Sequence, residues 1–194
     1  MSRRRRAYPL LVELSVVMVG VLAALAFDEW REEQQREDLL VNVLNGLLVE
    51  TRGNLQAAED VVEYHRRMRD VFDDYANRLR ETGKWQYPEE ATEGMRLAEL
   101  SDAAYQSGLM TGLLPLVQYD TLEAMSRVYG QIDAYFRNNE RYALATLQTD
   151  FRDGSRYLRI LNFHFGALAD SEATLIEAIK ALESRLEQEI RERS

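Results

Sequence analysis

The residues best suited to acid–base or metal chemistry in this sequence are its two histidines, His65 and His164. Carboxylate-bridged di-iron sites in helical bundles use a glutamate three residues before a histidine, because one helical turn then brings both ligands together. Val62 and Leu161 occupy those positions instead. A zinc site needs further histidines or cysteines, and the sequence contains no cysteine. We therefore interpret both histidines as ordinary helix residues and expect no metal site and no cofactor.

Motifs for nucleophilic catalysis or phosphate binding are also missing from the sequence. It contains no Gly-x-Ser-x-Gly elbow and no glycine-rich phosphate loop. Ser107-Gly108 is interpreted as a helix C-terminus. Carboxylate pairs such as Glu59-Asp60 fit the solvated face of a helix in a chain with this many acidic residues. We expect no catalytic residue, and the chain is not predicted to be an enzyme.

The composition is that of a folded, acidic chain. Of its 194 residues, 46% are hydrophobic and 29% are charged, and the formal net charge is -9. After the four arginines and Glu13 of residues 1–27 are set aside, 20 basic and 32 acidic residues remain, a net charge of -12. So acidic a domain repels nucleic acid, and we expect none as a partner. The absence of cysteine excludes disulfides and thiolate catalysis.

The N-terminal apolar run predicts a membrane anchor. Residues 8–27 (YPLLVELSVVMVGVLAALAF) have about the ~20 residues that a helix needs to cross a bilayer core. Arginines 3–6 precede this run and acidic residues follow it, which predicts a cytoplasmic N-terminus. We expect residues 1–7 to be a basic cytoplasmic tail and residues 28–194 to be a helical periplasmic domain of a bacterial inner-membrane protein, with the lipid bilayer as a partner.

A cleavable signal peptide has a similar layout. Ala24-Leu25-Ala26 before Phe27 matches the small-x-small pattern of a cleavage site. Because residues 1–27 are part of this chain, we expect an anchor rather than a segment that is removed.

Four residues in or beside the predicted anchor are candidates for membrane or partner contact. Glu13 is an ionisable group within the apolar run; it either reaches the cytoplasmic interface or hydrogen-bonds the helix of another subunit. Gly20 and Ala24 form a small-xxx-small pair that permits close helix contact. Trp30 lies where an interfacial aromatic residue is expected.

A long helix is predicted from residue 28 to about Thr82, because this stretch lacks proline and its apolar residues recur every three or four positions. Thr82-Gly83 should end this helix, and residues 84–88 (KWQYP) should form a turn. Its predicted buried stripe contains Leu40, Leu44, Leu47, Thr51, Leu55, Ala58, Val62, His65, Met68, Phe72, Tyr75 and Leu79.

Further helices are predicted in the rest of the chain. A second helix is expected from Glu89 to Gln106 and a third over residues 121–140, the latter started by a capping box of Asp120 and Glu123. More helix is expected over residues 140–169, with a break at Gly154, followed by a final helix capped by Asp170 and Ser171. The inner faces of the third and final helices should carry Leu122, Met125, Val128, Tyr129 and Ile132, and Leu175, Ile179, Leu182, Leu186 and Ile190. The predicted fold is all-α, an N-terminal transmembrane helix continuing into a long helix, with an up-down helical bundle domain.

Two stretches resemble a known family. The first, E-x₃-V-x-x-G-V-L-x-A-L-x₄-W, is formed by Glu13, Val17, Gly20, Val21, Leu22, Ala24, Leu25 and Trp30, and is followed by Leu44, Leu48, Glu50 and Asn54. The second is AAYQSGLMTGLLPLVQYDTLEAMSRVY, residues 103–129. Together they are similar to an uncharacterised bacterial family of single-pass inner-membrane proteins. The resemblance implies a membrane anchor and a helical extracytoplasmic domain, and it implies no catalytic residue.

The tyrosines of the second stretch are the remaining candidates for partner contact. Three tyrosines, Tyr105, Tyr119 and Tyr129, lie close together in the sequence. Tyrosine suits both a bundle core and a partner-facing surface. We expect a non-catalytic accessory or scaffold subunit of a larger inner-membrane assembly, with other membrane subunits as partners and with homo-oligomers left open. The alternative is a sensory or ligand-binding periplasmic domain that signals through a partner protein.

Overall fold

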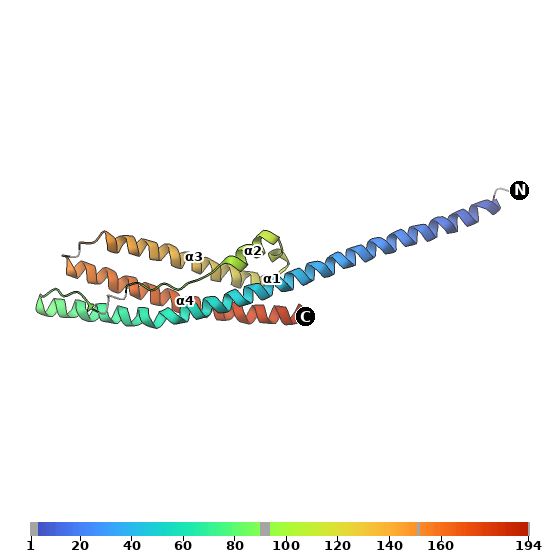
Figure 1. Ribbon diagram of the computed structural model, residues 1–194. Helices are drawn as coiled ribbons and strands as arrows, with labels where there is room; N and C mark the ends of the chain where they lie inside the picture. The colour runs from blue at the N-terminus through green and yellow to red at the C-terminus, as the bar shows by residue number, and fades with distance from the viewer. Residues whose placement is uncertain (1–3, 90–93, 151, 194) are drawn as a thin grey trace. The chain divides into compact units, whose positions relative to one another are not determined.

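The computed structural model describes residues 4–89, 94–150 and 152–193, and for residues 4–12 and 14 it describes the helix without its side chains. Over these ranges the chain is helical and contains no strand. The elements are α1 (Arg4–Thr82), α2 (Ala103–Thr111), the short 3₁₀ helix η2 (Leu114–Leu116), α3 (Tyr119–Leu147) and α4 (Gly154–Arg193) (Figure 1). The predictions of an all-α chain and of a long first helix are confirmed. The chain divides into unit 1, Met1–Asn42, and unit 2, Val43–Ser194.

Unit 1 consists of the first part of α1; its large apolar side chains from Val16 to Trp30 are exposed, whereas Leu40, from the predicted buried stripe, is buried. The large apolar side chains between residues 16 and 27 have exposed fractions from 53% to 66%. Among the residues with described side chains, no helix has a stretch that is both long and apolar enough to cross a membrane. Residues 8–12 and 14, which belong to the span predicted at 8–27, lie outside that described set.

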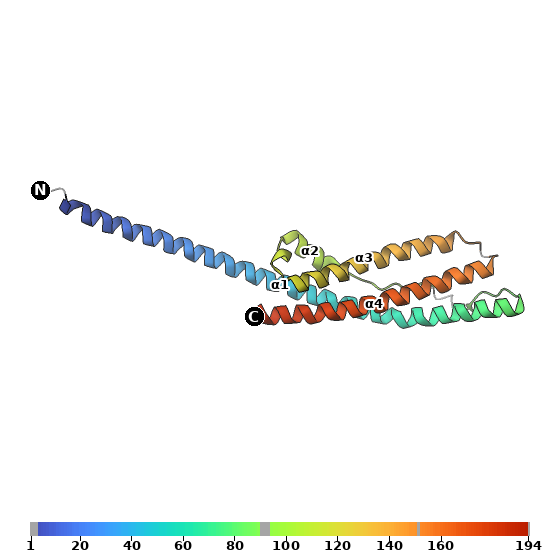
Figure 2. The same ribbon diagram turned by 180° about the vertical axis from the view of Figure 1, so that it is seen from behind.

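Unit 2 is a helical bundle built from residues 43–82 of α1 together with α3 and α4. Figures 1 and 2 show α3 running in the same direction as this part of α1, and α4 running in the opposite direction. Ion pairs follow the antiparallel register of α1 and α4: Arg52 bonds Glu183 at 2.7 Å, and Glu59 bonds Lys180 at 2.8 Å. As the residue number rises in one helix, it falls in the other.

The core of unit 2 confirms most of the predicted stripes. On α1, every predicted residue from Leu44 to Phe72 is buried except Leu55, which is half-buried like Tyr75 and Leu79. On α4, four of the five predicted residues are buried and Ile190 is half-buried. One aromatic-rich core cluster of unit 2 contains Tyr64, Met68, Phe72, Tyr157, Leu158, Leu161 and Phe165. Burial of these large side chains is the main source of stability for such a bundle.

The helix predicted from Glu89 to Gln106 is wrong over residues 94–102, which are not helical. Residues 90–93 lie outside the described residues. Gly94 has a positive φ of +72°, which few residues other than glycine adopt, and side chains from the bundle bond the backbone beyond it. Figure 1 shows this segment returning along the bundle to α2. The return connection of the predicted up-down bundle is therefore largely extended chain.

The predicted boundaries of the later helices also need correction. α3 is longer than the predicted 121–140, and its N-cap is Gln118, which makes no side-chain cap bond, so the capping box of Asp120 and Glu123 is wrong. The break predicted at Gly154 is confirmed, because α4 begins there. Asp170 and Ser171 do not start a new helix: they lie inside α4. Polar residues interrupt the apolar pattern at this point, and packing on the other helices continues the helix across them.

The turn after α1 determines which residue can start α4. Gly83 ends α1 with φ +67°, and its N–H bonds the carbonyl of Leu79 at 2.9 Å. The chain then places Trp85 against Gly154: a Cβ on Gly154 would lie 2.4 Å from Cδ2 of the indole. Glycine is therefore required here because the Trp85 ring occupies the space of a side chain.

Replacing Gly154 with alanine should destabilise unit 2. The added methyl group would displace Trp85 from its position against Tyr157, and overpacking of this kind costs about 1–3 kcal/mol. The free energy of unfolding of the full chain, measured by chemical denaturation in detergent, checks this.

Gly130→Ala is the matched control. Gly130 lies within α3, and its added Cβ would meet nothing within 4 Å. This substitution should stabilise the chain by about 0.5–1 kcal/mol, because alanine favours helix over glycine. Equal effects from the two substitutions would contradict the proposed role of Trp85.

Candidate functional site: a buried carboxylate network

The carboxylate of Glu172 on α4 is fully buried at the centre of a polar network in unit 2. His65 of α1 places its Nδ1 2.8 Å from both carboxylate oxygens. The hydroxyl of Tyr135 on α3 donates to Oε1 at 2.8 Å, and it accepts the N–H of Ala98 at 3.2 Å. One carboxylate therefore joins α1, α3 and α4, and it reaches the extended segment 94–102 through Tyr135.

These contacts satisfy groups that would otherwise be costly to bury. A buried carboxylate without hydrogen-bond donors is strongly destabilising, whereas the donors from His65 and Tyr135 offset much of its lost hydration. Burial raises the pKa of Tyr135 well above its ordinary value of 10, and the charge of Glu172 adds to that rise. The Tyr135 hydroxyl therefore keeps its proton and remains a donor to Glu172 at neutral pH.

His164 lies beside this network and is also fully buried. Its Nε2 is 3.2 Å from Oδ1 of Asn139, and its ring centroid is 5.0 Å from that of Tyr142. Burial lowers the pKa of His164 to about 4, and His65 contributes to the lowering. The ring is therefore neutral at pH 7. Among the residues that the structure describes, no cluster of three or more His, Cys, Asp or Glu residues could hold a metal ion.

A second carboxylate, that of Glu50 on α1, holds the start of α2. It accepts the backbone N–H groups of Ala104 and Tyr105 at 2.8 and 3.3 Å. It also accepts the hydroxyls of Ser101 at 2.9 Å and Tyr129 at 2.7 Å. The N-cap residue of α2, Asp102, makes no side-chain bond to the backbone N–H groups at the start of the helix, so a carboxylate from another helix takes over the capping role.

Asn54 of α1 fixes the end of the extended segment. Its side-chain amide donates to the carbonyl of Ser101 and accepts the N–H of the same residue, both at 2.7 Å. About three helical turns further along α1, the Tyr64 hydroxyl donates to the carbonyl of Gly94 at 2.5 Å. Side chains of α1 thus replace the backbone partners that a helix would provide to this segment.

A third carboxylate, that of the buried Glu189 on α4, holds the chain before α3. It accepts the N–H of Gln118 at 2.9 Å and the guanidinium of Arg193 at 3.0 Å. Arg193 also donates to the carbonyl of Leu116 at 2.9 Å. Glu50, Glu172 and Glu189 therefore serve the same purpose at three levels of the bundle: each holds a connecting segment against the helices.

The structure places the predicted contact residues in two groups. Glu13, Gly20, Ala24 and Trp30 belong to unit 1, where Glu13 and Ala24 are exposed, Trp30 is 56% exposed, and a Cβ on Gly20 would meet nothing within 4 Å. Their role in partner contact stays a prediction.

The structure brings two of the three predicted tyrosines together. Tyr105 and Tyr129 stack with ring centroids 4.1 Å apart and planes 7° from parallel. Tyr129 is only 6% exposed and bonds Glu50, so its contacts lie within the bundle. Burial and then Glu50 raise its pKa far above 10. Tyr119 lies apart from them and is 77% exposed, which leaves it accessible to a partner.

The carboxylates that organise the site were missed by sequence reasoning, although a pattern was present. Glu172 lies four residues after Leu168 and three before Leu175, and Glu189 lies three after Leu186, which are core positions of α4. A carboxylate on one apolar stripe and His65 on another together indicate a buried pair. Periodicity alone does not tell which residues of different helices meet.

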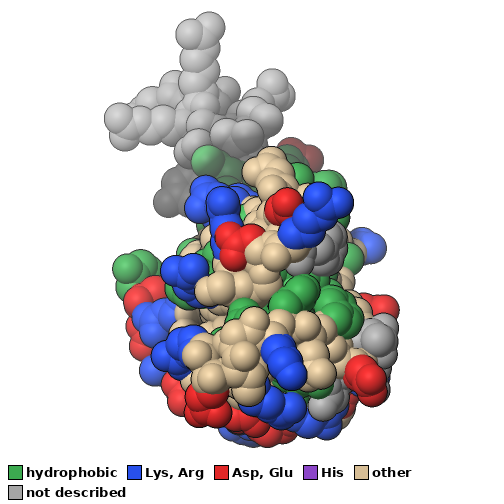
Figure 3. Space-filling view, turned by 90° about the vertical axis from the view of Figure 1, so that its left-hand side faces the viewer, with side chains coloured by type: hydrophobic (Ala, Val, Ile, Leu, Met, Phe, Trp, Pro, Cys, Tyr) green, Lys and Arg blue, Asp and Glu red, His purple; other side chains and the backbone are tan. Residues whose placement is uncertain are grey.

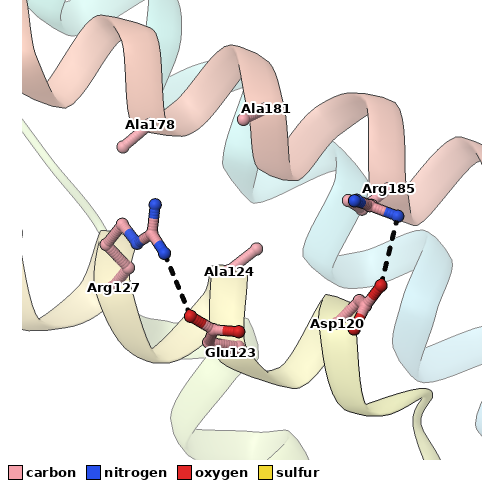
Figure 4. A pocket seen from close by; sticks show the side chains of 7 residues that line it. All are labelled: Asp120, Glu123, Ala124, Arg127, Ala178, Ala181 and Arg185. Carbon is pink, nitrogen blue, oxygen red and sulfur yellow. Dashed lines mark hydrogen bonds and ion pairs between the residues drawn. The ribbon is translucent and has the colours of Figure 1, made fainter.

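A shallow pocket of about 280 Å³ lies between α3 and α4, floored by Ala124, Ala178 and Ala181 (Figure 4). Its charged side chains already bond one another: Arg127 bonds Glu123 at 3.0 Å, and Arg185 lies 3.5 Å from Asp120. These ion pairs neutralise the rim of the pocket. The arrangement favours packing and surface solubility over the binding of a charged ligand.

Comparison with protein-family models, with curated proteins and with solved structures finds no match to this chain. The first of the two stretches that suggested a family resemblance lies in unit 1, and the second lies in unit 2. Glu50 follows the first stretch, and it contacts Tyr105 and Tyr129 of the second. The resemblance itself stays a prediction, and the assignment of function rests on geometry.

Replacing Tyr135 with phenylalanine tests the Glu172 network. The substitution removes a donor from the buried carboxylate and an acceptor from the Ala98 N–H, and unsatisfied buried groups cost about 1–3 kcal/mol each. We expect a lower free energy of unfolding and faster hydrogen exchange at the Ala98 amide. Tyr119→Phe is the control, since that side chain is exposed. An Ala98 amide that exchanges equally slowly in both variants would argue against the network.

Proposed function

We propose that the chain is a non-catalytic accessory or scaffold subunit of a bacterial inner-membrane assembly. Residues 8–27 anchor it, residues 1–7 are cytoplasmic, and residues 28–194 form a periplasmic domain. One observation carries the proposal: apolar side chains cover every face of α1 between residues 16 and 27, and all of the large ones are exposed.

Because these apolar side chains lie on all sides of the helix, we expect lipid or protein to surround it. Val16, Val17, Met18 and Val19 follow one another at about 100° steps around the helix, so together they cover its circumference. Apolar surface in water costs about 25 cal/mol per Å², and a helix that is apolar on all sides is normally buried in lipid or protein. The arginines at 3–6 and the acidic residues after Phe27 favour a bilayer with the N-terminus in the cytoplasm.

Unit 2 carries charged side chains on its surface (Figure 3), in contrast to the apolar surface of α1 between residues 16 and 27. Figure 3 faces the end of unit 2 at which α1 ends and α4 begins, and it shows basic and acidic side chains intermixed around a small apolar patch. The connection around η2 is different, because it exposes several large apolar side chains: Leu109, Met110, Leu116 and Tyr119. Exposed apolar and aromatic groups of this kind favour contact with another protein.

The polar network of unit 2 supports a scaffold rather than a reactive centre. The oxygens of Glu50 and Glu172 are occupied by donors from within the chain, and each carboxylate holds a connecting segment in place. Such a network stiffens the connection that carries the exposed residues near η2. A rigid surface binds a partner with less loss of conformational entropy.

Membrane fractionation of the host cell, followed by native-gel separation in mild detergent, tests both parts of this proposal. The wild-type chain should resist alkaline extraction from the membrane and migrate with partners in a complex larger than its own mass. Val19→Arg should move it to the soluble fraction, because arginine at the centre of a spanning helix costs about 2.5–3.5 kcal/mol. Val49→Arg is the matched control, since Val49 is also exposed on α1 but lies outside the predicted span.

Tyr119→Ser separates anchoring from partner contact in the same experiment. The variant should stay in the membrane but leave the complex, while Tyr119→Phe should keep it. Extraction of the wild-type chain by alkali alone would overturn the anchor. Migration of the wild-type chain as a lone monomer or dimer would overturn the role as a subunit.

A further inference from the structure

His65, His164 and Glu172 are buried titratable groups of unit 2, and one of them, His164, has no part in the proposed function. The three side chains each have an exposed fraction of 0%. Among the described residues, Nε2 of His65 and Nδ1 of His164 have no hydrogen-bond partner. Buried polar atoms are nearly always paired, so two such nitrogens in one core are an unusual feature.

We propose that these histidines form an acid-operated latch: a proton on His164 opens the seam between α3 and α4 at mildly acid pH. All of the residues involved lie in unit 2, so the latch does not depend on the proposed membrane anchor.

The hydrogen bond to Asn139 determines where the proton must bind. Oδ1 of Asn139 can only accept, so Nε2 of His164 carries the hydrogen in this bond. The lone pair of the neutral ring is therefore on Nδ1. A second proton can bind only there, and the resulting N–H would lack an acceptor within the described part of the core.

Among the residues that the structure describes, none beside His164 supplies a charge that would stabilise an imidazolium. α3 contributes the neutral Asn139 and Tyr142, and α1 contributes His65. The carboxylate of Glu172, on α4 itself, is bonded by His65 and by Tyr135, and Tyr135 in turn accepts the Ala98 N–H of segment 94–102. A proton on His164 is thus favoured only after α3 and α4 separate and water reaches the ring.

The direction of the pH dependence follows from these contacts. The pKa of His164 is lowered to about 4 in the closed bundle, against 6.5 for a solvated ring. Between pH 4 and pH 6.5 the open state therefore binds more protons than the closed state does. As a result, the closed state loses stability as the pH falls from 6.5 to 4. The opening equilibrium should increase about thirtyfold between pH 7.5 and pH 5.

Opening at this position would change a defined set of ring contacts. Phe165 follows His164 directly and packs against Tyr64 and Phe72 of α1, with ring centroids 6.2 and 5.2 Å apart. Those contacts join α1 to α4. Separation of α3 from α4 acts on other ring contacts, those of Tyr142 on α3 with Phe163 and His164 on α4.

Two measurements on the full chain in detergent test the latch. The first is an NMR titration of the ring C–H signals, which is simple to assign because the chain has two histidines. The His164 signal should not titrate above pH 5 while the bundle is closed. A His164 midpoint near pH 6.5 in the closed bundle would overturn the proposal.

The second measurement is hydrogen exchange of α3 and α4 amides near Asn139 and His164, corrected for the intrinsic pH dependence of exchange. The wild-type chain should lose about thirtyfold protection from pH 7.5 to pH 5, while amides bonded to Glu50 keep theirs. His164→Phe keeps an aromatic ring without a titrating group, and it should remove this dependence. Asn139→Asp places a carboxylate beside Nε2, stabilises the imidazolium in the closed state, and should also weaken the dependence.

The two variants change the site in different ways, so a folding defect in one does not decide the result. Equal acid sensitivity in the wild-type chain and in either folded variant would overturn the latch. Full protection of the wild-type seam at pH 5 would overturn it as well.

Discussion

The constraint on which unit 2 depends is the burial of a carboxylate in its core. Glu172 cannot be enclosed among apolar side chains unless donors surround it, and the donors come from His65 on α1 and Tyr135 on α3. Those two contacts fix the register of three helices at one level. Apolar packing alone tolerates sliding by a helical turn more readily than a carboxylate with directed partners does.

The same principle explains why part of the chain is extended where a helix was expected. Residues 94–102 satisfy their backbone through side chains of the bundle: Asn54 pairs with Ser101, and Tyr135 accepts the N–H of Ala98. A helix here would satisfy its own backbone but would leave these side chains without partners inside the bundle. Interactions distant in the sequence thus override the local helical pattern.

Helical periodicity predicted the all-α class, the end of α1 at Thr82-Gly83, and most of the buried faces of α1, α3 and α4. It could not predict the path of residues 94–102, because that path depends on polar side chains of other helices. It also divided α4 in two, because polar residues at 170–172 interrupt the apolar stripe. The tyrosines were identified as one set, yet the structure stacks Tyr105 on Tyr129 within unit 2 and leaves Tyr119 exposed. Membrane placement and partner contact stay predictions from the N-terminal pattern.

A double-mutant cycle at His65 and Tyr135 tests most directly whether Glu172 is the common node of unit 2. The free energy of unfolding of the full chain would be measured for His65→Phe, for Tyr135→Phe and for the double variant. Because both side chains donate to one buried carboxylate, we expect a coupling free energy of about 1 kcal/mol or more. Effects that add to within about 0.3–0.5 kcal/mol would show that the two contacts act independently, and would contradict the account.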